Sequence, residues 1–121
     1  MSPFRPVLYL KDTCPHCLKL RIFLLESGLL GRFDQRIFAQ GDDAEAAIRE
    51  ELGQQFENVT FPAVQYAPDV YMKESDAIIE HYGEEAGIAR CDLPVFTAYA
   101  GGLLPRYMDA RRELRTFMQL G

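Results

Sequence analysis

The segment Cys14-Pro15-His16-Cys17 constrains this chain most, because of what stands on either side of it. Before it, Val7-Leu8-Tyr9-Leu10 is an apolar run typical of a strand buried on both faces, and the residues after it, 18–30, look helical. Pro15 then falls in the first helical turn, where proline is tolerated. A thiol at a helix N-terminus is exposed to the helix dipole, and a second one three residues on lies within its reach. The pattern predicts thiol–disulfide chemistry, with Cys14 as the nucleophile and Cys17 as the resolving thiol.

Strand and helix patterns alternate along the first 87 residues. We predict, in order, a strand at 7–10, a helix at 15–27, an edge strand at 33–38, a helix that opens with a capping box at Asp42 and Glu45, short strands at 63–66 and 70–72, and a helix that Ser75 caps. The inner face of the last helix is expected to carry Ile78, Ile79 and Tyr82. Residues 1–87 are therefore interpreted as one α/β domain.

Residues 88–121 are interpreted as a helical extension packed on that domain. Leu93-Pro94 opens a helix, which Gly101-Gly102 and Pro105 are expected to interrupt. Apolar residues then recur at helical spacing, namely Tyr107, Ala110, Leu114 and Phe117. This stripe must pack on something, and a homodimer formed through it stays open as the alternative to packing on the domain.

Composition narrows the cellular setting and the partners. Three cysteines are too few for the disulfide framework of a small secreted protein, and no basic flank with a long apolar core opens the chain, so we expect a reducing cytoplasm. No apolar run approaches the roughly 20 residues that cross a bilayer, so no membrane role is expected. A metal is not expected either, because Cys91, His16 and His81 do not complete a four-ligand zinc site with the CxxC.

The net charge of −5 is unevenly distributed. Residues 37–89 carry −10, whereas residues 1–36 carry +3, and Lys11, Lys19 and Arg21 flank the CxxC. Local positive potential lowers a thiol pKa and attracts an anionic substrate. The acidic chain has no basic stripe interleaved with aromatics, so nucleic acid is not expected as a partner.

Three segments together resemble the glutaredoxins and the N-terminal domains of glutathione transferases, within the thioredoxin superfamily. Lys11-Asp12-Thr13-Cys14-Pro15-His16-Cys17 is similar to the glutaredoxin active-site pattern, with His16 in place of tyrosine; Thr60-Phe61-Pro62 is similar to their cis-proline segment; and Glu74-Ser75-Asp76-Ala77-Ile78-Ile79 is similar to the transferase segment that holds the γ-glutamyl group. The resemblance implies a thioredoxin-like fold, with a four-stranded mixed sheet flanked by helices.

The resemblance also implies glutathione as co-substrate. Backbone groups of Phe61, freed by a cis Pro62, would pair with its cysteinyl unit. Ser75 at a helix N-terminus suits the γ-glutamyl carboxylate, and Glu74 or Asp76 can accept from its ammonium. Lys11 could take the glycine carboxylate, and Thr13 belongs to the same binding set. His16 resembles the DsbA-type motif, which stabilises the thiolate, so a Cys14 pKa well below that of a free thiol is predicted.

Three functions are compatible with these residues. The first is a glutathione-dependent oxidoreductase acting on disulfides of small molecules or proteins through Cys14, Cys17 and His16. The second is a glutathione transferase-like enzyme, and the third is a non-catalytic module that binds glutathione or an iron–sulfur cluster. A brown protein, inactive on disulfides, would indicate the third.

Overall fold

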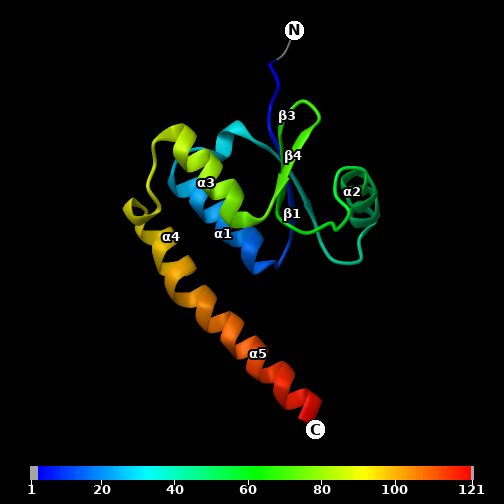
Figure 1. The fold of residues 1–121 in the computed structure, drawn as a ribbon, viewed down its shortest axis with the longest axis vertical. Helices are drawn as coiled ribbons and strands as arrows, with labels where there is room; N and C mark the ends of the chain where they lie inside the picture. The colour runs from blue at the N-terminus through cyan, green and yellow to red at the C-terminus, as the bar shows by residue number, and fades with distance from the viewer. Residues whose placement is uncertain (1–2, 121) are drawn as a thin grey trace.

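A computed structural model describes residues 3–120, which form a four-stranded sheet with helices on both faces (Figure 1). The strands and helices are β1 (Val7–Lys11), α1 (Pro15–Glu26), β2 (Asp34–Phe38), α2 (Asp43–Gly53), β3 (Ala63–Ala67), β4 (Val70–Lys73), α3 (Ser75–Ala86), α4 (Pro94–Ala98) and α5 (Leu104–Leu120). The predicted order of elements through residue 87 is confirmed. Among the described residues, no helix is both long and apolar enough to span a lipid bilayer.

The sheet has the strand order β2-β1-β3-β4, in which β1 pairs in parallel with β2 and antiparallel with β3. β4 pairs antiparallel with β3, and β2 is an edge strand, as predicted. This mixed sheet, with helices on both faces, is the thioredoxin-like arrangement that the sequence predicts.

Two apolar cores lie on opposite faces of β1, because neighbouring side chains of a strand point to opposite faces. Leu8 and Leu10 pack with α1 and α3 on one face, whereas Tyr9 packs with α2 on the other. All three are at most 1% exposed. The apolar run at 7–10 is thus a strand buried on both faces, as predicted, and only Asp12 and Thr13 separate the end of β1 at Lys11 from Cys14.

Side-chain hydrogen bonds fix the starts of two helices. The Asp42 carboxylate accepts from the backbone N–H of Glu45 (2.9 Å), which confirms the predicted cap of α2. The Glu26 carboxylate, at the end of α1, accepts from the backbone N–H groups of Val95 (2.9 Å) and Phe96 (2.7 Å). Because these N–H groups belong to the first turn of α4, Glu26 anchors α4 against α1. Phe96 then packs edge-on against Phe23 in the core.

The chain stays helical through the segment where a break is expected. Residues 99–103 form a π-helical turn that runs directly into α5, so Gly101-Gly102 and Pro105 do not interrupt the helix. The wider turn ends at Leu103, two residues before Pro105, which has no backbone N–H to donate to the helix. The prediction of a break is therefore wrong.

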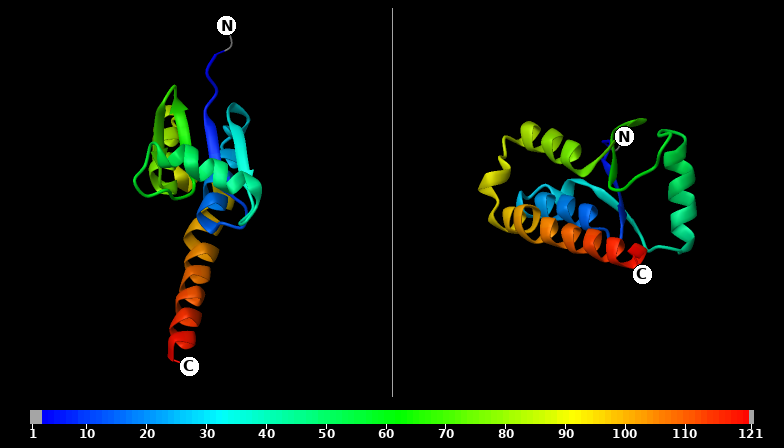
Figure 2. Two further views of the ribbon diagram at one scale, coloured as in Figure 1. Left: turned by 90° about the vertical axis from the view of Figure 1, so that its right-hand side faces the viewer. Right: turned by 60° about the horizontal axis from the view of Figure 1, so that its bottom comes forward.

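Helix α5 extends away from the α/β part of the molecule (Figures 1 and 2). Leu104 at its start is buried, but the exposed fraction is 47% for Tyr107, 59% for Leu114 and 74% for Phe117. The expected packing of this stripe on the domain is not seen. Within the described residues, the extension contacts the domain through its first part, from Leu93 to Leu104, which includes Phe96 in the core and the Tyr99 hydroxyl on Pro15.

Candidate functional site

Cys14 is the N-cap residue of α1, at the junction that the sequence identifies. Its sulfur accepts a hydrogen bond from the backbone N–H of Cys17, with a sulfur–nitrogen distance of 3.4 Å. Cys17 is 1% exposed, and its sulfur accepts from the backbone N–H of Lys11 at 3.4 Å. The two thiols therefore have the expected positions: Cys14 at the helix terminus and Cys17 beneath it.

Hydrogen bonding lowers the pKa of Cys14 to about 5. The largest cause is the hydrogen bond with the Cys17 side chain; backbone N–H groups of Cys17 and His16 and the charge of His16 act in the same direction, whereas burial opposes them. The pKa of Cys17 is raised, because its proton is shared with Cys14 and its thiol is buried. The direction is the predicted one, but the predicted causes omit the largest, the Cys17 thiol.

A polar pocket of about 350 Å³ lies on one side of the α1 N-terminus. Its lining includes six of the predicted site residues, His16, Phe61, Pro62, Glu74, Ser75 and Asp76. The Phe61–Pro62 peptide bond is cis, as predicted. Lys19 and Thr60, which are not among the predicted site residues, also line this pocket. Within the described part of the chain, the buried Thr60 hydroxyl has no hydrogen-bond partner.

Ser75 is the first residue of α3 and not its N-cap. Glu74 takes the N-cap position with a φ of 78°, so the chain turns into the helix one residue earlier than the capping prediction has it. The prediction that Ser75 caps α3 is therefore wrong. Glu74 holds the cap position although its backbone is not extended, as that of an ordinary cap residue is. Ser75 is 7% exposed and lies in the first turn, where backbone N–H groups lack helical acceptors.

Asp76 is held by cations of this chain. Its Oδ1 lies 3.0 Å from Lys19 Nζ and 3.5 Å from a guanidinium nitrogen of Arg90. The hydrogen bond with Lys19 keeps the pKa of the Asp76 carboxyl below its usual range. Because the Lys19 side chain is only 10% exposed, this pair also neutralises a nearly buried charge. Glu74 is therefore the better placed of the two predicted acceptors for a ligand ammonium.

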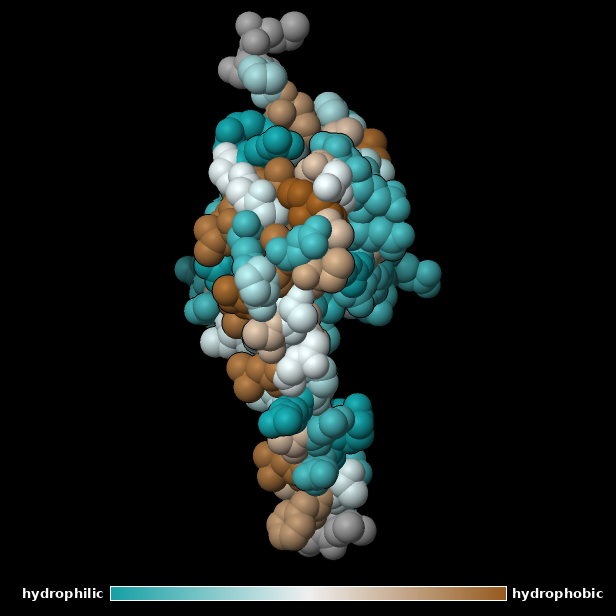
Figure 3. Space-filling model, turned by 90° about the vertical axis from the view of Figure 1, so that its left-hand side faces the viewer, coloured by the Kyte–Doolittle hydropathy of each residue, from teal (hydrophilic) through white to brown (hydrophobic). Residues whose placement is uncertain are grey.

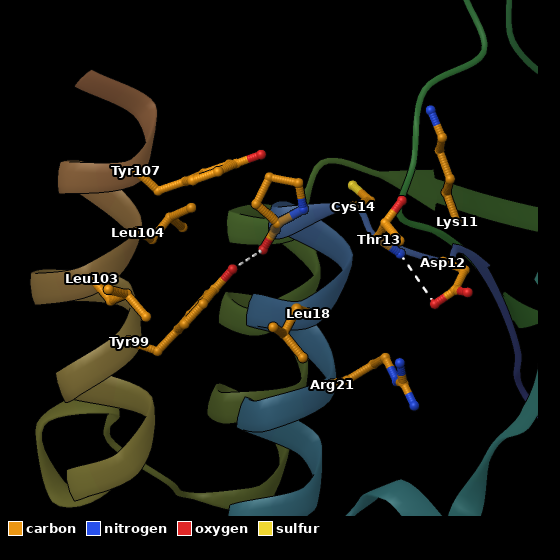
Figure 4. A pocket seen from close by; sticks show the side chains of 11 residues that line it. Lys11, Asp12, Thr13, Cys14, Leu18, Arg21, Tyr99, Leu103, Leu104 and Tyr107 are labelled. Atoms are coloured by element: carbon orange, nitrogen blue, oxygen red, sulfur yellow. Dashed lines mark hydrogen bonds between the residues drawn. The ribbon is translucent and has the colours of Figure 1, made fainter. Parts of the chain in front are cut away.

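Cys14 itself lines a second, mainly apolar pocket of about 440 Å³ (Figure 4). Lys11 and Thr13 line this pocket and not the polar one, and the Lys11 side chain points away from the α5 wall in Figure 4. The far wall comes from the C-terminal extension: Tyr99, Leu103, Leu104 and Tyr107. The sequence does place Tyr107 in an apolar stripe, but not beside Cys14.

Tyr99 joins the C-terminal extension to the active-site helix. Its hydroxyl donates a 2.7 Å hydrogen bond to the carbonyl oxygen of Pro15, next to Cys14. Burial raises the pKa of Tyr99, so the phenol keeps its proton for this bond. No local motif marks Tyr99, since the contact joins residues 84 positions apart.

Comparison with known proteins identifies the family. The model of the family "Glutathione S-transferase, N-terminal domain" matches residues 8–88, which is most of the chain. The chain belongs to this family. Its likeness to glutathione transferase N-terminal domains, predicted from the three motifs, is thereby confirmed. No curated protein matches this transferase-type domain.

Solved structures with the same fold include three transferases. A glutathione S-transferase from the Antarctic clam Laternula elliptica has 22% identity and a TM-score of 0.56, over 69% of this chain and 36% of its own. Human glutathione-S-transferase T1-1, apo form, has 20% identity and a TM-score of 0.55, over 69% of this chain and 33% of the human chain. Glutathione transferase Omega 2C from Trametes versicolor has 20% identity and a TM-score of 0.52, over 70% of this chain and 40% of the fungal chain. This transferase-type domain thus spans about a third to two-fifths of the structures it matches.

Metal-ligating side chains do not gather in the described part of this transferase-type domain. Among residues 3–120, no group of three or more His, Cys, Asp or Glu side chains is placed to hold a metal ion. The donors around Cys14 are backbone N–H groups and a thiol, which are suited to stabilising an anion.

Proposed function

We propose that this transferase-type domain is a glutathione-dependent thiol–disulfide oxidoreductase that uses Cys14 and Cys17. The observation that carries the proposal is a Cys14 thiol with a pKa of about 5, held at a helix N-terminus directly above a second, buried thiol. At neutral pH such a thiol is a thiolate, which is the reactive form in disulfide exchange. Glutathione in a reducing cytoplasm supplies the electrons.

The polar pocket supports glutathione as the co-substrate. Backbone groups at the cis Phe61–Pro62 segment suit the extended cysteinyl unit, the first turn of α3 at Ser75 suits the γ-glutamyl carboxylate, and Glu74 accepts from the ammonium. Lys11, beside Cys14 but outside this pocket, has the charge to pair with the glycine carboxylate.

In the reaction, the Cys14 thiolate attacks the glutathione sulfur of a mixed disulfide. A bond forms between Cys14 and glutathione, the substrate disulfide breaks, and the substrate leaves as a thiolate that takes a proton from water. A second glutathione thiolate then attacks the glutathione sulfur on Cys14, which releases oxidised glutathione and restores the Cys14 thiolate. His16 stabilises that thiolate in each cycle through its N–H and charge.

Cys17 supplies a second route to resolution. Once Cys14 is bonded to a substrate sulfur, Cys17 loses the hydrogen-bond partner and the neighbouring anion that raise its pKa. It can then be deprotonated and attack Cys14, forming the Cys14–Cys17 disulfide and expelling the bound thiolate. This route lets a protein disulfide be reduced by two electrons from the CxxC.

The apolar pocket favours a second candidate, a glutathione transferase-like reaction. Aromatic and aliphatic side chains of residues 99–107 lie beside Cys14, where an apolar co-substrate could bind next to glutathione. In that case an electrophilic carbon, and not a disulfide, accepts the sulfur of glutathione. We interpret residues 88–121 as the extension that supplies this wall to the domain of residues 1–87.

One assay separates the two candidates. The purified chain is given glutathione with either a glutathione mixed disulfide or an apolar electrophile, and Cys14→Ser, Cys17→Ser and Cys91→Ser are compared. We expect disulfide reduction that Cys14→Ser abolishes and Cys17→Ser retains for small disulfides. Cys91→Ser is the matched control, because Cys91 is exposed and lines neither pocket beside the α1 N-terminus. Turnover of the electrophile without disulfide reduction would overturn the proposal in favour of the transferase.

A further inference from the structure

The C-terminal helix presents an apolar seam that the rest of the described chain does not cover. The seam consists of Leu103, Tyr107, Ala110, Leu114 and Phe117, all exposed. These positions alternate spacings of four and three residues, which is the repeat of a two-stranded coiled coil. Figure 3 shows hydrophobic side chains gathered along one edge of α5 and hydrophilic ones along the other.

An uncovered seam of this length calls for a partner. No residue of α5 from 105 to 119 is buried in this chain. Isolated helices of about 15 residues are marginal in water, so an α5 with this sequence needs tertiary or quaternary contacts to stay helical. Exposed apolar surface that is continuous along a helix marks an interaction site.

We propose that α5 pairs with α5 of a second copy of this chain in an antiparallel coiled coil. The charges beside the seam decide the orientation. In a parallel pair, Arg106 would lie next to Arg111 of the partner subunit, which is repulsive. In an antiparallel pair centred between Tyr107 and Ala110, Arg106 lies next to the partner's Glu113. The two-fold symmetry of such a dimer forms this ion pair twice.

The pairing also completes the apolar pocket beside Cys14. Leu103 and Tyr107 belong both to the seam and to the wall of this pocket. With the centre between Tyr107 and Ala110, Leu114 of the partner subunit packs against Leu103, so the partner helix covers the mouth of the pocket. The function of this enclosed pocket rests on the proposed function, whereas the pairing of the helices does not.

Sedimentation velocity over a series of protein concentrations tests the pairing. The wild-type chain is expected at twice its monomer mass of 13.8 kDa. Arg106→Glu and Glu113→Arg should each raise the dimer dissociation constant roughly tenfold, because two attractive pairs become repulsive. The double variant with both changes should recover wild-type affinity. Arg115→Glu, which makes the same charge change on the outer face of α5, is the matched control and should dimerise normally.

Other results overturn the proposal. A wild-type chain that stays monomeric at every concentration excludes the dimer, and tighter association of Arg106→Glu shows a parallel pair.

The covering of the apolar pocket is tested by the alkylation rate of each cysteine, followed by peptide mass spectrometry. Cys14 should react faster in Glu113→Arg than in wild type, while the exposed Cys91 serves as internal control. An unchanged Cys14 rate shows that the partner does not cover the pocket. Neither sedimentation nor the alkylation rate depends on turnover, so a chain without oxidoreductase activity still tests the pairing of the helices and the covering of the pocket.

Discussion

Replacing Cys17 by alanine tests whether the buried thiol activates Cys14. The hydrogen bond with the Cys17 side chain is the largest cause of the lowered Cys14 pKa. A hydrogen bond to a charged group contributes about 1.5–3 kcal/mol, and one pKa unit corresponds to about 1.36 kcal/mol. Because Cys14 is half-buried and water replaces part of the lost bond, we take the lower end of that range. The pKa should therefore rise by about one unit in Cys17→Ala.

The measurement is the pH dependence of Cys14 alkylation, read at the Cys14 peptide. The wild type should give an apparent pKa of about 5 and Cys17→Ala one of about 6. His16→Ala keeps the backbone N–H that bonds Cys14, so the pKa of Cys14 should rise less in this variant than in Cys17→Ala. A Cys17→Ala pKa unchanged from the wild type would refute the reasoning, because the thiolate would then depend on other groups.

The same thiolate gives a pH dependence of stability with a defined sign. The pKa of Cys14 is lower in the folded than in the unfolded chain, so ionisation stabilises the reduced fold. This contribution is absent below pH of about 5, grows as the pH rises, and is complete above the ordinary thiol pKa of about 8.5. In urea unfolding, the stability difference between wild type and Cys14→Ser should therefore shrink as the pH falls toward 5. A difference independent of pH would contradict it.

Three further variants address the supports of the site. Asp76→Asn leaves the nearly buried Lys19 ammonium without its carboxylate, and should lower the free energy of unfolding by about 1 kcal/mol, since Asp76 itself is largely solvent-exposed. Tyr99→Phe removes the hydrogen bond to the Pro15 carbonyl and should cost about 1 kcal/mol in the same measurement. Glu26→Gln weakens the cap of α4 and should increase proteolysis of residues 94–120, with little change in the α/β part; equal cleavage in wild type and variant would contradict the anchoring role.

Local patterns are enough to predict the elements through residue 87. The strand at β1 is predicted from four consecutive apolar residues, and the start of α2 from an Asp–Glu spacing that the backbone satisfies directly. The cis bond before Pro62 and its closeness to Ser75 follow from the family resemblance, which supplies the topology that composition alone does not. Each of these inferences depends on residues near one another in sequence or on a fold with a known strand order.

The features that the sequence does not predict depend mostly on contacts between residues far apart in the chain. The pairing of Asp76 with Lys19 joins residues 57 positions apart, and it converts a predicted ligand group into a partner for a buried cation. The left-handed backbone of Glu74 moves the cap away from Ser75, although serine is the commoner cap residue. The C-terminal stripe was correctly placed on one helix face, but periodicity does not show which surface covers that face.

Cys14 lines the apolar pocket, and the polar pocket includes His16, two residues further along the chain, so the two proposed reactions would use different surroundings of one helix N-terminus. The polar pocket offers a helix N-terminus and hydrogen-bonding groups that suit a charged tripeptide, whereas the apolar pocket offers aromatic side chains from 99–107. Disulfide exchange needs only that the second sulfur reach Cys14, so it tolerates many substrates. Transfer to a carbon electrophile needs an enclosed apolar pocket to orient that carbon. The proposed covering of the apolar pocket by the partner helix would therefore decide whether this domain could also transfer glutathione to a carbon electrophile.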